Sequence, residues 1–309
     1  MLNKRFPFAH TFSIVARDSD TGDMGVAVQS HWFSTGSIVT WAEPGVGAVA
    51  TQSMVEISYG PLGLAGMREH KEPEKVLAEL LQKDETPEVR QVAMIDANGR
   101  IAVHTGSRCI FEAGHLVGNQ YCVQANMMLK PTVWPAMARA FEECTGPLPE
   151  RLMAALDGAQ SEGGDIRGKQ SAAMLVVSGK ASSEPWKGIL VDLRVEDDPE
   201  PLQELRRLLQ VQRAYEHMNR GDDLLSQGKV AEAFEAYRLG ALLAPHIDEL
   251  PFWQAVTLLD TDREELAVPI LQKLFFADPN WFVLLQRLPA AGMLKEDPEL
   301  MERISRILH

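Results

Sequence analysis

Apolar residues recur at alternating positions over residues 11–16 and again over 24–29, and a polar segment separates the two runs at 18–23. A period of two is typical of β-strands that bury one face, and Asp, Ser and Gly favour the turn between such strands. The pattern predicts a β-hairpin that begins a large sheet. Thr11 stands at the head of its first strand.

Short apolar runs and helical stripes continue as far as residue 195. Strands are predicted at 37–42, 45–52, 89–95, 101–104, 121–126, 171–178 and 188–195, and helices near Pro61 and at 72–83, 127–144 and 149–161. The stretch between residues 104 and 121 is predicted to be irregular. The four strands before residue 53 are predicted to form one continuous sheet.

The order of these elements is sheet, helix pair, sheet, helix pair, sheet. Each helix pair must bury an apolar stripe, so distant strands are expected to pair into two stacked sheets with helices outside. A doubly wound parallel sheet is not expected, because the strands follow one another in tight hairpins, as at Asn98-Gly99, and parallel pairing needs a crossover. The predicted class is α+β, with a four-layer αββα sandwich.

After the acidic, proline-containing segment 197–201 the pattern becomes purely helical. Five positions recur after 34 residues: Gly221, Ala233, Tyr237, Gly240 and Pro245 become Ala255, Ala267, Leu271, Leu274 and Pro279. This spacing is typical of tetratricopeptide repeats, in which paired helices touch at small residues. Residues 281–309 are expected to form a helical cap. The predicted domains are 1–198 and 199–309.

Composition restricts the partners and the compartment. The 309 residues are 45% hydrophobic with a net charge of -13, so binding to nucleic acid or to anionic membranes is not expected. No apolar run is long enough for a membrane helix or a signal peptide, which predicts a cytoplasmic protein. Cys109, Cys122 and Cys144 lack the CxxC spacing of zinc sites and do not form a disulfide framework.

Several stretches of the first domain together resemble one known family. They are residues 10–14, 25–30, 45–52, 90–92, 104–106, 163–173 and 191–195. These stretches are similar to the bacterial proteins grouped as domain-of-unknown-function family 1028, which is assigned to the Ntn-hydrolase (N-terminal nucleophile) superfamily. The resemblance covers about three-fifths of the chain. It implies the αββα sandwich and, as the reaction, hydrolysis of an amide bond.

The resemblance also implies where catalysis takes place. Thr11 would be the nucleophile once cleavage after His10 gives it a free α-amine as its base. Backbone amides at the end of the fourth predicted strand, near Gln52, would hold the oxyanion. The second strand would end beside Thr11 at residues 29–31, and Asn126 and the loop 165–171 would support the nucleophile. The candidate catalytic residues are Thr11, Ser30, His31, Gln52, Asn126, Asp165, Arg167 and Ser171. Each also fits an ordinary polar strand end.

Metal and cofactor chemistry is not predicted. His10, His31, His104 and His115 form no HExxH or other ligand spacing. His31 is the best placed of them for proton transfer, because imidazole titrates near neutral pH. Residues 163–170 resemble a phosphate-binding loop, but glutamine ends the motif where Ser or Thr would hold magnesium, and a strand follows instead of a helix.

Two functions are compatible with these patterns. The first is an Ntn-type hydrolase that cleaves an amide bond in a small or peptidic substrate. Proteasome-type proteolysis is not expected, because the run 37–42 lacks the lysine that such enzymes carry on the third strand. The alternative is a catalytically silent scaffold whose helical repeats bind a protein partner. Two repeats are fewer than the roughly three needed for a stable stack, so docking on the first domain or a homo-oligomer is expected.

Overall fold

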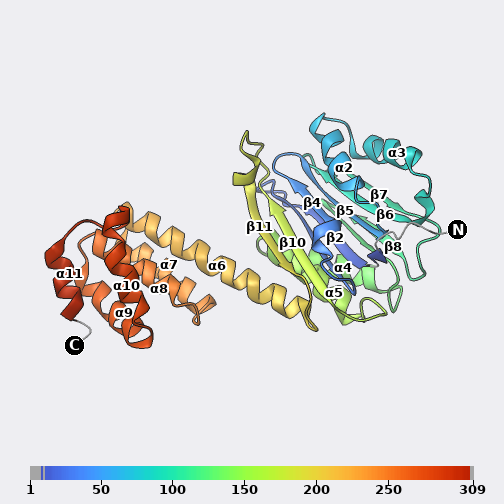
Figure 1. The fold of residues 1–309 in the computed structure, drawn as a ribbon. Coiled ribbons are helices and arrows are strands. Elements are labelled where there is room, and N and C mark those ends of the chain that lie inside the picture. Colours follow the sequence, from blue (N-terminus) through green and yellow to red (C-terminus); the bar gives the residue numbers. More distant parts are fainter. Residues whose placement is uncertain (1–7, 10, 307–309) are drawn as a thin grey trace. The chain divides into compact units, whose positions relative to one another are not determined.

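The structure is a computed structural model that describes residues 8–9 and 11–306. The chain forms two compact units that divide between Leu208 and Leu209, within the long helix α6 (Pro201–Ser226). The first unit mixes helices and strands, and its sheets are antiparallel, whereas the described part of the second is helical (Figure 1). None of the described helices is both long and apolar enough to cross a membrane.

One sheet has six antiparallel strands. In spatial order they are β11 (Ile189–Val195), β10 (Ser171–Val177), β3 (Met24–Ser30), β2 (Thr11–Arg17), β9 (Tyr121–Ala125) and β8 (Gly114–Gly118). The predicted hairpin of β2 and β3 forms its centre. Thr11 lies opposite Ser30, and Ser171 lies opposite Ser30 on the other side. The three residues therefore form one row across the sheet.

The other sheet has five antiparallel strands. They are β1 (Phe8–Ala9), β4 (Thr40–Glu43), β5 (Gly47–Met54), β6 (Arg90–Asp96) and β7 (Ile101–Thr105). The prediction of one continuous sheet before residue 53 is wrong, because β2 and β3 lie in the first sheet and β4 and β5 in this one. The chain passes from the first sheet to the second through helix α1 (Gly36–Val39). Residues 37–39 of the predicted strand 37–42 are therefore helical.

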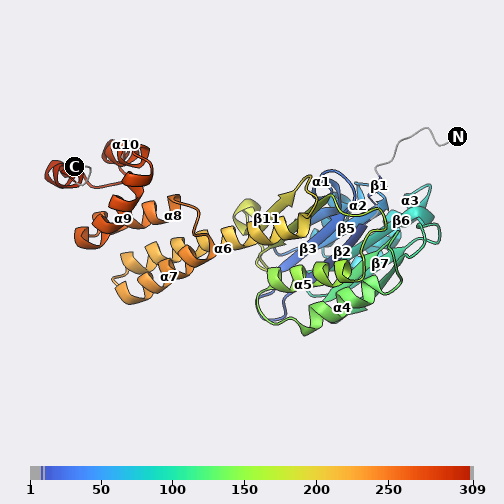
Figure 2. The same ribbon diagram turned by 90° about the horizontal axis from the view of Figure 1, so that it is seen from below.

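A pair of helices covers the outer face of each sheet (Figure 2). α2 (Tyr59–Arg68) and α3 (Pro73–Lys83) pack on the five-stranded sheet, and α4 (Val133–Glu143) and α5 (Leu148–Ser161) pack on the six-stranded sheet. Between the sheets lies an apolar layer that includes the fully buried Val15, Val26, Ala50 and Ile95. Each buried side chain of valine size or larger contributes ~1.5–3 kcal/mol, so this layer holds the sheets together.

Two further local predictions are wrong. β8 occupies residues 114–118, where an irregular stretch was expected, because its alternate exposure at the sheet edge leaves no apolar run in the sequence. The helix predicted at 127–144 begins only at Val133. Met127 has a positive φ of 59°, and Pro131 disfavours the helical conformation of the residue before it. Residues 127–132 therefore form a turn that precedes α4.

Arg90, at the start of β6, forms a buried ion pair with Asp84, which follows α3. The distance from Arg90 Nε to Asp84 Oδ2 is 2.7 Å, and the two side chains are 3% and 8% exposed. Burial opposes ionisation of Asp84, but hydrogen bonds from Arg90 and from the Thr86 backbone outweigh it and lower the pKa of the carboxyl below 3.8. The unfolded chain then binds more protons than the folded chain, so this stabilisation is present above pH 3.8 and is lost as the pH falls further.

We expect Asp84→Asn to destabilise the first unit by about 3 kcal/mol at neutral pH, because it leaves the buried Arg90 guanidinium without its counter-charge. The difference from the wild-type chain should shrink as the pH is lowered through the pKa of Asp84. Urea unfolding followed by circular dichroism at several pH values measures both effects. Asp192→Asn is the matched control, since its pair with Arg194 is 41% exposed on both sides, and it should cost less than about 1 kcal/mol. Equal stability of both variants at neutral pH would contradict the prediction.

The second unit continues α6 with further helices. They are α7 (Val230–Leu243), α8 (Glu249–Asp260), α9 (Glu264–Ala277), α10 (Asn280–Arg287) and α11 (Pro298–Ser305). Each bound of α9 lies 34 residues after the same bound of α7. Gly221 has no room for a side chain, because a Cβ atom there would lie 2.3 Å from the Tyr237 ring. The small residue of the sequence pattern therefore marks a close contact between α6 and α7.

Candidate active site

The layer between the two sheets changes from apolar to polar toward the start of β2. Along β2, Val15 faces the apolar layer, and Ser13, two residues earlier on the same face, reaches across to Gln52 of the other sheet. Polar side chains with no exposed surface form the polar end: Thr11, Ser13, Ser30, Gln52, Gln91, Gln124 and Asn126. Burying such groups is costly unless they are hydrogen-bonded. We call these seven residues the polar cluster.

Thr11 begins β2 inside the polar cluster. Its carbonyl oxygen accepts hydrogen bonds from Gln52 Nε2 and from the backbone N–H of Asn126, both at 3.1 Å. Its Oγ1 atom is buried and has no hydrogen-bond partner within the described chain. A buried hydroxyl in this condition is uncommon. The backbone of Thr11 is thus held firmly, while its side-chain oxygen makes no competing hydrogen bond.

Side-chain amides connect the rest of the cluster across both sheets. Ser13 Oγ donates to Gln52 Oε1 at 2.6 Å, and Gln52 Nε2 donates to Gln91 Oε1 at 2.7 Å. Asn126 Nδ2 donates to the same Gln91 oxygen at 2.8 Å. Gln124 Nε2 donates to Ser13 Oγ at 3.2 Å. Linked amides polarise one another, and the cluster is uncharged because its side chains are hydroxyls and amides.

The network continues from the cluster to the protein surface. Gln91 Nε2 donates to Thr105 Oγ1 at 3.0 Å, and Thr105 Oγ1 lies 2.8 Å from His115 Nδ1 on the edge strand β8. Partial burial, and secondly the neighbouring His104, lower the pKa of His115 below 6.5. Both influences favour the neutral His115 ring, and a neutral imidazole both donates and accepts. This chain gives the buried amides a hydrogen-bonded connection to a titratable surface group.

The backbone turns sharply directly after the two residues that donate to the Thr11 carbonyl, Gln52 and Asn126. Ser53 follows Gln52 with a φ of 74°, and Met127 follows Asn126 with a φ of 59°. Residues with bulky side chains disfavour this left-handed region, and such strained positions concentrate at functional sites. At Ser53 and Met127 the fold therefore holds the backbone in a conformation that these residues disfavour, and both positions lie next to the polar cluster.

Three other predicted residues meet beyond the end of β3. The backbone N–H of His31 donates to Asp165 Oδ2 at 3.2 Å, and Asp165, which is 2% exposed, pairs with Arg167 at 2.7 Å. The Nδ1 atom of His31 lies 3.3 Å from the carbonyl oxygen of Lys169. A cavity of about 280 Å³ adjoins this group and is lined by His31, Lys169, Gln170, Asp197, Asp198 and Pro199.

Ser171 has a structural role in the loop that follows β3. Its hydroxyl donates to the carbonyl oxygen of Trp32 and accepts from the backbone N–H of Thr35 at 3.1 Å. Both contacts brace residues 31–35. A serine whose proton is already donated to a carbonyl is poorly prepared for nucleophilic attack, so the Ser171 hydroxyl holds the loop at Trp32 and Thr35 instead.

The structure thus arranges the predicted residues in two groups. Thr11, Gln52 and Asn126 meet at one carbonyl oxygen. The group of His31, Asp165 and Arg167 lies just beyond Ser30, the residue that pairs with Thr11 across the sheet. His10, and with it the predicted cleavage site, lies outside the described residues. Within the described ranges, no group of three or more His, Cys, Asp or Glu side chains is arranged to hold a metal ion.

The sequence did not single out Ser13, Gln91 or Gln124, although they connect the cluster. The sequence feature that could have indicated Gln91 and Gln124 is a side-chain amide within an otherwise apolar strand. Gln91 in β6 and Gln124 in β9 are both fully buried, and the strand alternation places each on the inner face, next to Ala93 and Cys122 of the apolar layer.

The fold and the cluster define a two-sheet α+β protein with a buried amide site and a helical second unit. Residues 11–205 match the family of unknown function DUF1028, so the chain belongs to this family. This confirms the family resemblance of the first domain. None of the curated proteins compared with the chain matches it.

Two solved structures are similar to the first part of the chain. The crystal structure of a Silicibacter pomeroyi protein of the same family has 30% identity and a TM-score of 0.58, covering 65% of this chain and 84% of that chain. Anbu, an ancestral β-subunit from Yersinia bercovieri, has 11% identity and a TM-score of 0.32, covering 64% of this chain and 92% of that chain. The first of these supports the family membership.

Proposed function

We propose that this chain is an Ntn-type hydrolase that cleaves an amide bond in a small or peptidic substrate, with Thr11 as its nucleophile. The proposal rests on the position of Thr11, which begins a central strand with its carbonyl held by the cluster and its hydroxyl without a hydrogen-bond partner among the described residues. In this proposal the two sheets and their outer helices are an Ntn-type αββα sandwich. The helical unit is of the tetratricopeptide type.

The pairing of β1 supports cleavage before Thr11. Ala9 pairs with Ser53 in the five-stranded sheet, whereas Thr11 pairs with Ser30 in the six-stranded sheet. The chain therefore changes sheets between Ala9 and Thr11. Cleavage of the bond before Thr11 would separate two strands that belong to different sheets, and it would leave β2 paired with β3 and β9.

The proposed reaction uses the new α-amine of Thr11 as the base. The amine takes the hydroxyl proton, Oγ1 forms a bond to the substrate carbonyl carbon, and the C–N bond breaks as the proton passes to the leaving amine. Water then cleaves the ester and returns a proton to Oγ1. Backbone N–H groups at the end of β5, near Gln52, are the proposed donors to the oxyanion. Gln52 and Asn126 are positioning residues, because they hold the carbonyl of Thr11 itself.

The uncharged cluster suits an amine base. A neighbouring carboxylate would stabilise the protonated amine and raise its pKa, which would remove the base at neutral pH. The side chains of the polar cluster are hydroxyls and amides only. The cavity beside His31 is the proposed place for the part of the substrate that extends along β3.

The intact mass of the chain, purified from its own host, tests the first step. We expect the mass to fall by that of residues 1–10, because Thr11 must become the first residue, and Thr11→Ala to keep the full mass. Thr21→Ala is the matched control, since this threonine lies in the exposed turn after β2, and it should be processed normally. An active preparation whose chain stays at full length would contradict the proposal.

The second candidate function is a catalytically silent scaffold whose helical unit binds a partner. It is favoured by the cavity between α6 and α8, which is independent of Thr11. This function predicts that Thr11→Ala leaves the biological role intact, whereas substitutions along α8 remove it.

A further inference from the structure

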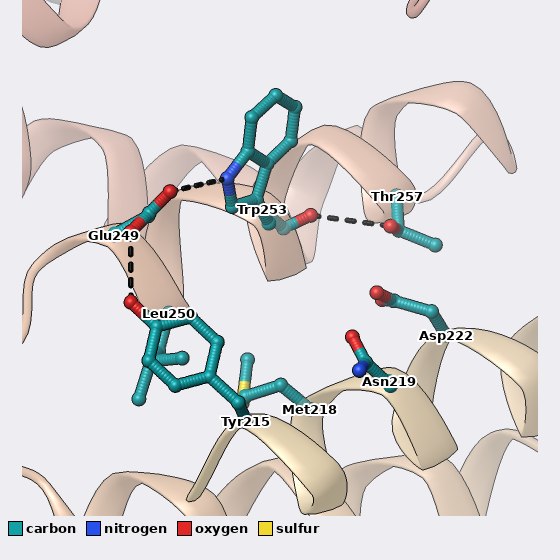
Figure 3. A pocket seen from close by; sticks show the side chains of 8 residues that line it. All are labelled: Tyr215, Met218, Asn219, Asp222, Glu249, Leu250, Trp253 and Thr257. Carbon is teal, nitrogen blue, oxygen red and sulfur yellow. Dashed lines mark hydrogen bonds between the residues drawn. The ribbon is translucent and has the colours of Figure 1, made fainter. Parts of the chain in front are cut away.

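The helical unit contains a cavity of about 330 Å³ between α6 and α8 (Figure 3). Tyr215 and Asp222 lie seven residues apart on α6, and Glu249 and Trp253 lie four residues apart on α8. Side chains at these spacings share one helix face. Figure 3 shows the side chains of both helices around a common space, with Tyr215, Glu249 and Trp253 on one side and Asp222 on the other.

Hydrogen bonds fix the aromatic side of the cavity. The Tyr215 hydroxyl donates to Glu249 Oε2 at 2.8 Å, and the Trp253 indole N–H donates to Glu249 Oε1 at 3.3 Å. Both oxygens of one carboxylate therefore hold two aromatic side chains beside it. Met218 and Leu250 add apolar groups to the lining, and Asn219 and Thr257 add an amide and a hydroxyl.

Among the described residues, the hydrogen-bond partners of the two cavity carboxylates are neutral groups. Glu249 accepts from neutral hydroxyl and indole groups, and Asp222 accepts from the Tyr237 hydroxyl at 2.7 Å. None of the eight described residues that line the cavity is basic. Burial is the strongest influence on Asp222 and raises the pKa of its carboxyl. A positive charge in the cavity would relieve that penalty.

We propose that this cavity binds an organic cation, namely the ammonium group of a free amine or of a lysine side chain. Aromatic faces attract such a group through their negative π-faces, and the two carboxylates add charge-assisted hydrogen bonds. A hard metal ion is not the proposed ligand, because it needs oxygen atoms on all sides, whereas half of the lining residues, Tyr215, Met218, Leu250 and Trp253, place aromatic or aliphatic groups around the cavity. The proposal concerns the second unit alone and does not depend on hydrolysis at Thr11.

Titration of the full-length chain with n-butylammonium tests the proposal. The readout is the NMR signal of the Trp253 indole N–H, which the variant Trp253→Phe assigns. We expect saturable binding that weakens about tenfold in Asp222→Asn and in Glu249→Gln, a loss of about 1.4 kcal/mol each. Both variants keep an oxygen that accepts the tyrosine hydrogen bonds, and thermal unfolding checks that they fold. Asp223→Asn, an exposed neighbour outside the cavity, is the matched control and should bind normally.

Two further ligands complete the test. 1-Butanol has the same number of heavy atoms as n-butylammonium without the charge, so it should not bind. Nα-acetyl-lysine methylamide distinguishes the two possible origins of the ammonium group. If it binds more tightly than n-butylammonium, the ligand is a lysine side chain. If it binds more weakly, the ligand is a free amine. The proposal is overturned if 1-butanol binds equally, if neither cation binds saturably, or if Asp222→Asn and Glu249→Gln together leave the affinity unchanged. Normal cation binding by Thr11→Ala would show that the cavity acts independently of the proposed hydrolase.

Discussion

Thr11→Ala is expected to abolish the covalent labelling by a β-lactone that the processed wild-type chain shows. In the proposed enzyme the Thr11 oxygen attacks the lactone carbonyl, the ring C–O bond breaks, and the hydroxyl proton passes through the α-amine to the released alkoxide. The wild-type chain should gain about one acyl group per molecule, and Thr11→Ala should gain none, because alanine has no nucleophile. Peptide mass spectrometry measures the amount of label and locates it on Thr11.

Two variants decide whether the loss of label belongs to Thr11 itself. Thr11→Ser keeps a hydroxyl at the same place and should still be labelled. Ser30→Ala is the matched control, because Ser30 lies opposite Thr11 on the neighbouring strand and is equally buried. Label that persists in Thr11→Ala and disappears in Ser30→Ala would identify Ser30 as the nucleophile and overturn the assignment.

The hairpin of β2 and β3 could be predicted because its causes are local. The apolar alternation sets each strand, and polar residues set the turn between them. The sheet to which β4 and β5 belong could not be predicted in this way. β5 pairs with β6, and Gly47 lies opposite Asp96. Pairing between residues so far apart in the sequence does not change the hydrophobic periodicity of either strand. Alternation indicates which face of a strand is buried but does not indicate the sheet.

The candidate site could be predicted only in part, for the same reason. Thr11, Gln52 and Asn126 came from the family resemblance, and the structure brings them to one carbonyl oxygen. Gln91 gains its importance only when the two sheets are stacked, since Asn126 and Gln52 reach it from different sheets. The sequence of β6 alone shows only an isolated glutamine at position 91, and it does not indicate that Gln52 and Asn126 are its partners.

Gln91→Leu is expected to destabilise the first unit more than any other single change in the polar cluster. The Gln91 oxygen accepts from Gln52 and Asn126, and its nitrogen donates to Thr105 Oγ1 at 3.0 Å and to the Ala125 carbonyl at 2.9 Å. Leucine has a similar size but removes all four of these hydrogen bonds from the buried groups that make them. Each unsatisfied buried group costs ~1–3 kcal/mol, so we expect a loss of about 4 kcal/mol in the free energy of unfolding.

Urea unfolding followed by near-ultraviolet circular dichroism measures this loss. Gln82→Leu is the matched control, because Gln82 is exposed on α3, and exposed substitutions of this kind usually stay within ±0.5 kcal/mol. A loss in Gln91→Leu no greater than in the control would mean that the amide network does not join the sheets. A large loss would show that the groups that position Thr11 also hold the two sheets together, so that Thr11 cannot be repositioned without loosening the contact between the sheets.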